Sequence, residues 1–118
     1  MEDQNVSVQD LKKAVEDFVE SRDWKKYHNP KDLAESICIE AAELLEIFHW
    51  VPSEEVLVWK NNPVKRSRIM EELADVLIYC LSMANAMEIQ ISTVITQKLA
   101  TNSSKYPVDK YRGRARLE

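Results

Sequence analysis

Two pairs of carboxylates occur in this chain at the same spacing. Glu40 and Glu43 form the first pair, and Glu72 and Asp75 form the second. On a helix, residues three positions apart lie on one side, so each pair would present its two carboxylates together. Four carboxylates converging from two helices would repel one another strongly at low dielectric, so they would need a compensating cation. Hard oxygen ligands select Mg²⁺, or Mn²⁺, over zinc or copper.

The apolar residues around these acids indicate which side of each helix is buried. Around the first pair, the predicted buried stripe consists of Leu33, Ile37, Leu44 and Ile47. Around the second pair, it consists of Ile69, Leu73, Val76, Cys80 and Met87. Glu40 lies in the middle of its stripe and Glu72 at the edge of its own, and glutamate is rare at core positions unless it is paired or binds a metal. Spacing alone leaves open that Glu43 and Asp75 are ordinary surface residues.

A di-iron carboxylate site is another metal centre that a helical bundle can hold. Glu46 and His49 form one Glu-x-x-His motif, but that architecture needs two such helices. The only other histidine, His28, lies in no such motif. Cys38 and Cys80 are far apart and form no Cys-x-x-Cys pair, so neither a zinc site nor a redox motif is indicated. The acidic residues therefore favour a magnesium-type site.

The elements that would position these side chains are helices. The 118 residues include one glycine, whereas sheet proteins need glycine for tight turns. Cap residues followed by apolar residues at helical spacing predict four main helices, at about residues 8–26, 30–50, 63–88 and 92–105. A short helix is predicted from Ser53, Ser92 is the predicted cap of the last helix, and a basic tail at about 107–118 is expected to be irregular. The pattern predicts an all-α helical bundle in a single domain, residues 1–118.

The charge balance narrows the possible partners. The net charge is −4 and the isoelectric point about 5.3, which argues against a nucleic acid polymer as partner. No apolar run approaches the length of a membrane span, so we expect no membrane partner. Two separated thiols and no signal peptide favour a cytoplasmic location.

Four segments resemble a known family. IEAAELLEIFHW and EELADVLIY are similar to the ExxE…ExxD signature of the all-α nucleoside triphosphate pyrophosphohydrolases, the MazG-like group. FVESRDWKKYHNPKDL and KLATNSSKYPV, with the long helix continuing through Tyr79, resemble its dCTP pyrophosphatase branch. The similarity covers about residues 8–113, and the motifs are specific only in combination.

The resemblance implies a MazG-like helical subunit of a homo-oligomer with active sites near subunit contacts. The implied oligomer is a tetramer built from tight dimers, with a dimer as the alternative. It implies that the magnesium ligands, which are also the catalytic residues, are Glu40, Glu43, Glu72 and Asp75. It implies contacts to the base and sugar of a nucleotide from Trp24, His28, Trp50 and Tyr79. It implies contacts on the phosphate side from Lys98, Asn102, Lys105 and Tyr106.

The spacing of the aromatic residues agrees with this assignment. Trp50 follows Glu43 by seven residues and Tyr79 follows Glu72 by seven, so we expect both rings on the carboxylate sides of their helices. An aromatic pair beside a metal site suits the stacking of a base. Core packing is the open alternative for these two rings. Trp24 could instead cover a corner at the end of the first helix, and His28 could be an exposed loop residue.

The spacing on the last helix agrees as well. Lys98, Asn102 and Lys105 would present a cation, an amide and a second cation on one helix face, which suits a polyphosphate chain. The alternative is an ordinary solvated face.

These observations predict a magnesium-dependent enzyme that converts an NTP or dNTP, with dCTP favoured by the resemblance, into a nucleoside monophosphate and pyrophosphate. In the hypothesised mechanism, water attacks the α-phosphorus while Mg²⁺ held by the four carboxylates neutralises the phosphates. One alternative is the same scaffold acting on phosphoribosyl-ATP or a damaged nucleotide. Another is a non-catalytic helical module that binds a nucleotide or a partner helix, although such a module would be expected to lack one carboxylate pair.

Overall fold

The computed structural model describes residues 1–116, and these are helical with no strand among them. The four long helices are α1 (Val8–Ser21), α2 (Pro30–Phe48), α4 (Pro63–Ala86) and α5 (Ile91–Lys105). The shorter elements are η1 (Lys25–Tyr27), α3 (Ser53–Val56), η2 (Trp59–Asn61) and α6 (Val108–Tyr111), of which η1 and η2 are 3₁₀ turns. The predicted all-α fold class is therefore confirmed. The chain forms two compact units, one spanning Met1–Glu88 and a second that begins at Ile89.

Side-chain caps define where three of the long helices begin. Ser7 accepts a hydrogen bond from the Asp10 amide at 3.0 Å, and the Asp10 carboxylate accepts one from the Ser7 amide at 2.9 Å. Such a reciprocal pair satisfies two amides that the first helical turn leaves open. Asn29 and Asn62 cap α2 and α4 with a single bond each, in which the side-chain oxygen accepts from the amide three residues further on, and each is followed by proline at the first helical position. The predicted starts at these three sites are correct. The cap of the last helix lies two residues earlier than predicted, at Gln90 rather than Ser92.

Two helices end earlier than the apolar periodicity predicted. The first ends at Ser21 instead of near residue 26, because the backbone at Asp23 turns into the left-handed region with φ of 53°. The second ends at Phe48, because His49 is extended and Trp50 has φ of 67°. Non-glycine residues rarely adopt this conformation, so no simple sequence signal marks either turn. Trp50 therefore lies beyond the helix on which it was predicted.

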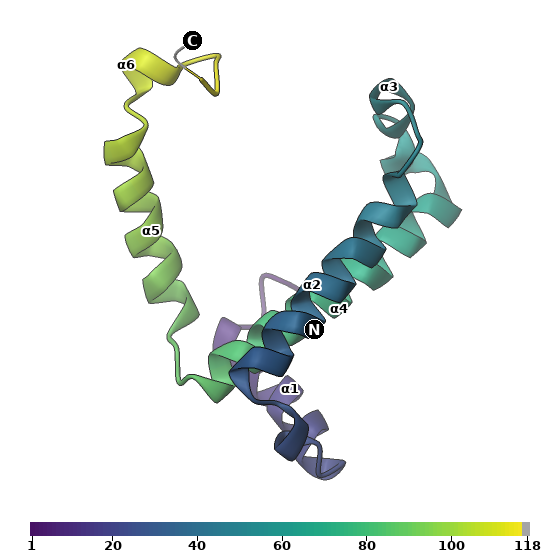
Figure 1. Ribbon diagram of the computed structural model, residues 1–118, viewed down its shortest axis with the longest axis vertical. Coiled ribbons are helices and arrows are strands. Elements are labelled where there is room, and N and C mark those ends of the chain that lie inside the picture. Colours follow the sequence, from purple (N-terminus) through teal and green to yellow (C-terminus); the bar gives the residue numbers. More distant parts are fainter. Residues whose placement is uncertain (117–118) are drawn as a thin grey trace. The chain divides into compact units, whose positions relative to one another are not determined.

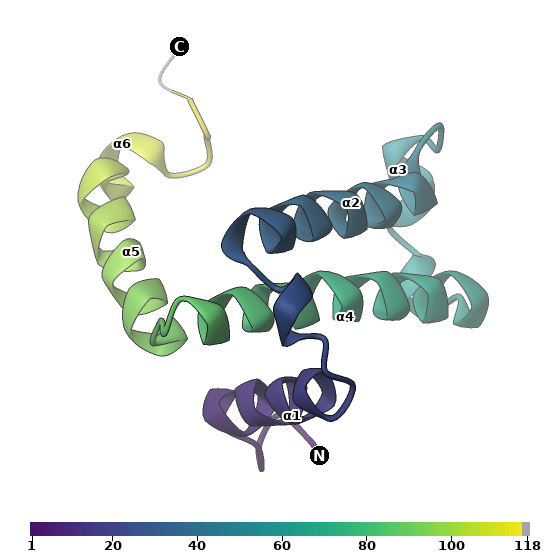
Figure 2. The same ribbon diagram turned by 60° about the horizontal axis from the view of Figure 1, so that its bottom comes forward.

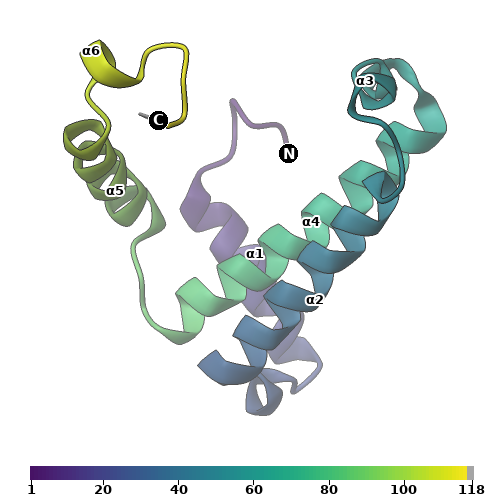
Figure 3. The same cartoon turned by 45° about the horizontal axis from the view of Figure 1, so that its top comes forward.

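Helix α4 is the central element of the first unit. Helix α2 runs beside it in the opposite direction, and α1 packs on another side of it (Figures 1 and 2). The connection through α3 and η2 lies at one end of the α2–α4 pair (Figure 3). The buried hydrophobic residues of this unit are Val19, Leu33, Ile47, Trp59 and Ala84.

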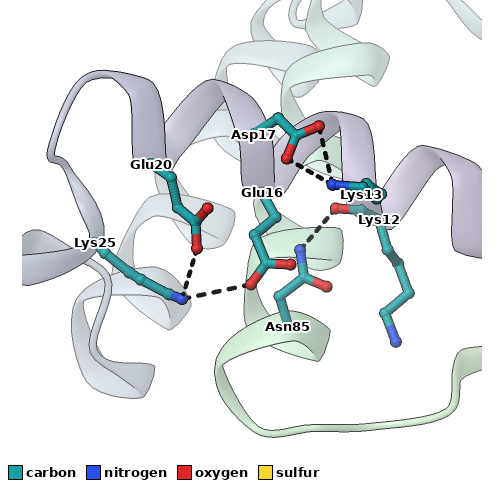
Figure 4. A network of polar contacts seen from close by, with 7 residues as sticks. All are labelled: Lys12, Lys13, Glu16, Asp17, Glu20, Lys25 and Asn85. Atoms are coloured by element: carbon teal, nitrogen blue, oxygen red, sulfur yellow. Dashed lines mark hydrogen bonds and ion pairs between the residues drawn. The ribbon is translucent and has the colours of Figure 1, made fainter.

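A side-chain hydrogen bond also joins α1 to α4. The Asn85 Nδ2 donates to the Lys12 carbonyl oxygen at 3.0 Å, between residues far apart in sequence (Figure 4). The bond holds the C-terminal end of α4 against the middle of α1.

Part of the predicted buried stripe is exposed in the single chain. On α2, Leu33 and Ile47 are buried, and Ile37 and Leu44 are half-buried. On α4, the half-buried members of the stripe are Ile69, Val76 and Cys80. Leu73 and Met87, by contrast, are 44% and 51% exposed, so their predicted burial is wrong. Apolar periodicity marks a face that prefers to leave water, but it does not say which surface covers that face.

The second unit contains α5 and α6. No residue of α5 is buried, and its exposed apolar side chains are Val94, Ile95 and Leu99. The predicted irregular tail begins as a regular turn, because Val108–Tyr111 form a helix after Pro107. Tyr106 and Tyr111 pack edge to face with ring centroids 5.1 Å apart. The last two tail positions, 117 and 118, lie outside the described residues.

No single described helix has the length and apolar character of a membrane span. Helices α4 and α5 meet that test only when they are joined as a bent pair, by length and composition alone.

Candidate metal and nucleotide site

Three glutamates from two helices meet in the first unit. One carboxylate oxygen each of Glu40, Glu43 and Glu72 lie within 4.8 Å of one another. The first two come from α2 and the third from α4, and the side-by-side run of these helices brings them together (Figure 2). Three oxygens at this separation can converge on one divalent cation.

Burial and mutual repulsion make this cluster unfavourable without a cation. The Oε2 atoms of Glu40 and Glu72 are buried and have no hydrogen-bond partner among the described residues. The pKa of Glu40 is raised to about 7, first by burial, then by its hydrogen bond with Glu43, and then by the negative charges of Glu43, Asp75 and Glu72. The pKa of Glu72 is also raised, by burial first and by the nearby Glu43 second. Buried carboxylates of this kind are usually paired with a cation or bound to a metal.

Asp75, the fourth predicted ligand, lies close enough to the three glutamates to interact with them electrostatically. The charge of Asp75 raises the pKa values of both Glu40 and Glu72. The group whose oxygens lie within 4.8 Å of one another contains the three glutamates and does not include Asp75. The unpartnered buried oxygens and the all-carboxylate donor set fit a hard divalent cation.

Two of the predicted nucleoside contacts lie together. The rings of His28 and Tyr79 are tilted by 49° with their centroids 6.4 Å apart. His28 directly precedes the cap of α2, whereas Tyr79 lies on α4, one turn beyond Asp75. The segment before α2 thus reaches α4 at Tyr79, which lies on the same side of the helix as Glu72 and Asp75.

The two tryptophans among the predicted contacts are placed differently. Trp24 packs edge to face on Phe18 with ring centroids 5.8 Å apart, and it is 43% exposed. Trp50 is 90% exposed and contacts the ring of His49, with centroids 4.3 Å apart. The prediction that Trp50 continues the carboxylate side of its helix is wrong, because α2 has ended at Phe48.

The predicted phosphate contacts all belong to the second unit. Lys98 and Lys105 are exposed and Asn102 is half-buried, all three on α5. Tyr106 follows the last residue of the helix and donates its amide to the Asn102 carbonyl oxygen at 2.8 Å. The Lys105 Nζ lies over the Tyr106 ring, 5.4 Å from its centroid. The predicted row of two cations around an amide is thus present on one helix.

A small cavity at Ser82, one turn of α4 beyond Tyr79, was not predicted from the sequence. Its volume is about 40 Å³, and its polar lining comes from Glu16, Lys25, His28, Ser82 and Asn85. The sequence did contain one signal: Ser82 is a polar residue in an apolar stretch, three positions after Tyr79 and seven after Asp75. We call this the Ser82 cavity.

Comparison with known proteins gives consistent matches over most of the chain. A model of the MazG-like family matches residues 35–116. The chain is 33% identical to dCTP pyrophosphatase 1 of Bos taurus and 29% identical to that of Homo sapiens, over 92% and 93% of its length. It spans 64% and 65% of those two proteins, less than two thirds of their length. The crystal structure of a pyrophosphatase from Archaeoglobus fulgidus is similar with a TM-score of 0.78 and 40% identity, over 91% of this chain and 98% of that one.

Proposed function

Because the chain belongs to the MazG-like family, we propose that it is a magnesium-dependent nucleoside triphosphate pyrophosphohydrolase that converts a (d)NTP and water into a (d)NMP and pyrophosphate. The observation that carries this proposal is the meeting of Glu40, Glu43 and Glu72, with carboxylate oxygens within 4.8 Å of one another. Two of these residues each have a buried oxygen without a hydrogen-bond partner among the described residues. Such a cluster opposes folding because its carboxylates are buried and repel one another, whereas a bound divalent cation would compensate their charge.

The acidic residues have a defined part in this reaction. Glu40, Glu43 and Glu72, with Asp75 beside them, would hold Mg²⁺. When bound, Mg²⁺ neutralises phosphate charge and lowers the pKa of water. The carboxylates fix where the triphosphate is held, so that water can attack the α-phosphorus with pyrophosphate as the leaving group. The contribution of the protein is positioning and charge stabilisation.

The remaining predicted contacts would hold the two ends of the substrate. His28 and Tyr79 offer a pair of rings beside the acidic residues for the nucleoside. Lys98, Asn102 and Lys105 offer cations and an amide for the phosphates. The relatives named dCTP pyrophosphatase 1 support dCTP as the favoured substrate.

An exposed apolar row supports assembly into a homo-oligomer. Met70, Leu73 and Leu77 recur at helical spacing on α4 and are 53%, 44% and 52% exposed. Contiguous exposed apolar surface of this kind is typical of subunit interfaces. We expect a tetramer, with a dimer as the smaller alternative, acting in the cytoplasm.

A substrate panel tests the proposed activity directly. Pyrophosphate release would be measured from dCTP, dUTP, dTTP, ATP and phosphoribosyl-ATP, with Mg²⁺ and with a chelator. We expect release from dCTP that requires the metal. Release from no nucleoside triphosphate, or equal release in the chelator, would contradict the proposal. Exclusive turnover of phosphoribosyl-ATP would assign the scaffold to another reaction.

A further inference from the structure

We propose that the Ser82 cavity receives the amino-bearing edge of a cytosine base and so determines which base the enzyme accepts. This proposal rests on the proposed function, because it places the phosphates of a nucleotide at the acidic cluster. It adds the residues that distinguish cytosine from uracil, namely Ser82 of α4 and Glu16 of α1, both of which line the cavity.

The position of the cavity along α4 suits a nucleotide. Asp75, Tyr79 and Ser82 follow one another at spacings of four and three residues, so they lie on one side of the helix. At a rise of about 1.5 Å per residue, Ser82 lies about 10 Å along the axis from Asp75. His28 lies between Tyr79 and the cavity, since its ring contacts the ring of Tyr79 and it also lines the cavity. A nucleotide with its phosphates at the acids and its sugar beside Tyr79 would direct its base toward Ser82.

The Ser82 hydroxyl is a buried hydrogen-bonding group at the cavity that lacks a protein partner among the described residues. The residue is 5% exposed, and its Oγ is buried without a hydrogen-bond partner among the described residues. A buried hydroxyl normally has a partner, either in the protein or in what the cavity holds. As a donor and acceptor, the hydroxyl can bond to a ring nitrogen or carbonyl oxygen of a base.

Glu16 supplies an acceptor that is held in place. Its Oε1 lies 3.4 Å from the Lys25 Nζ, which is itself 3.1 Å from the Glu20 Oε1. Figure 4 shows the Glu16 carboxylate directed from α1 toward Asn85 of α4, the residue whose amide is fixed by its bond to the Lys12 carbonyl. The ion pair with Lys25 favours the ionised form of Glu16, which lines the cavity. An ionised carboxylate accepts hydrogen bonds and cannot donate them.

This arrangement matches cytosine better than uracil or thymine. Cytosine presents an amino donor, and pairing of a glutamate with that amino group is a known mode of base readout. Uracil and thymine carry a carbonyl oxygen at the same place, so an acceptor would face the Glu16 carboxylate, which is also an acceptor, and no hydrogen bond could form between them. Adenine also has an amino group. The volume of about 40 Å³ holds only about three water-sized groups, which suits the edge of a pyrimidine and not a purine reaching from the same sugar position.

The test compares dCTP with dUTP in the wild type, Ser82→Ala and Glu16→Gln. We expect the wild type to prefer dCTP in kcat/KM. We expect each variant to lower that ratio by about tenfold, the size of one lost hydrogen bond, mainly through KM for dCTP. Glu20→Gln is the matched control, because Glu20 also pairs with Lys25 but does not line the cavity, so it should keep the wild-type ratio. Circular dichroism would show that every variant is folded.

Binding of the nucleoside monophosphates separates this proposal from the proposed function. Calorimetry with dCMP and dUMP is expected to show tighter binding of dCMP, lost in Ser82→Ala. A wild type that hydrolyses both substrates equally, or variants with unchanged ratios, would overturn the Ser82 proposal while the activity stands. A protein without turnover that still binds dCMP in a Ser82-dependent manner would overturn the activity alone. Equal binding of dCMP and dUMP by an inactive protein would overturn both.

Discussion

The rings of Phe48 and Trp59 are stacked with centroids 5.4 Å apart and planes inclined by 22°. Phe48 is the last residue of α2, and Trp59 begins the turn that leads into α4. The Lys65 Nζ lies 4.8 Å from the centre of the Trp59 ring. This stack therefore closes the connection between the two helices that carry the acidic residues, and it helps to fix their register.

Replacement of this tryptophan is expected to destabilise the protein strongly. Trp59 is 8% exposed, so Trp59→Ala would leave a cavity and is expected to cost about 3–5 kcal/mol of unfolding free energy. Urea denaturation followed by circular dichroism measures this loss. Trp50→Ala is the matched control, because Trp50 is 90% exposed and its removal should change stability by less than about 0.5 kcal/mol. Equal losses in the two variants would contradict the assigned packing.

Removal of a cluster carboxylate is expected to separate metal binding from folding. Glu72→Gln removes one charge from a group of acids that repel one another, so we expect the metal-free protein to be at least as stable as the wild type. The increase in Tm on adding Mg²⁺ should disappear, together with pyrophosphate release. Glu35→Gln on α2 is the control, since Glu35 is exposed and forms an ion pair with Lys31 at 3.7 Å. A Mg²⁺-dependent Tm in Glu72→Gln equal to that of the wild type would exclude this site.

The stability of the metal-free protein is expected to fall as the pH rises from about 4.5 to about 7. The pKa of Glu40 is raised from 4.5 to about 7, chiefly by burial. Within this window the folded state holds a proton that the unfolded state has released, so rising pH favours unfolding. The stabilisation is complete below pH 4.5 and is lost as the pH passes 7. Urea denaturation in a chelator at several pH values measures the slope, which Glu40→Gln should reduce.

Glycine at the end of α4 is expected to stabilise the chain. Glu88 has φ of 53°, and its amide donates to the Asn85 carbonyl at 3.3 Å. Glycine adopts this left-handed conformation without a steric penalty, so Glu88→Gly should raise the unfolding free energy by up to about 1 kcal/mol. Met87→Gly, one residue earlier at φ of −98°, is the control and should not stabilise. Thermal unfolding of both variants measures the difference.

Local signals in the sequence predicted where helices begin better than where they end. Asn29-Pro30 and Asn62-Pro63 specify both a side-chain cap and a proline that fits the first turn, so the starts of α2 and α4 were predicted correctly. The ends depend on Asp23 and Trp50 adopting a left-handed conformation that is uncommon for any residue other than glycine. Packing of the whole chain imposes these turns, and a local pattern does not reveal them.

The candidate site was predictable where it depends on the faces of single helices. The spacing of Glu40, Glu43 and Glu72 placed them on two predicted helices, and the fold brings these helices together. Ser82 and Glu16 could not be associated in advance, because their proximity depends on how α1 packs against α4. The burial of Leu73 was predicted wrongly for a similar reason: its apolar character is visible in sequence, but the surface that would cover it is not part of this chain's own core.

The three tryptophans differ widely in their surroundings, and this gives the protein an optical reporter. Trp59 is enclosed and Trp24 partly shielded, whereas the Trp50 indole is 90% exposed. In a variant that retains only Trp50, the emission should resemble that of an indole in water. A titrated nucleotide whose base stacks on that ring would quench and shift this emission, so a spectrum alone could show whether the ring takes part in recognition.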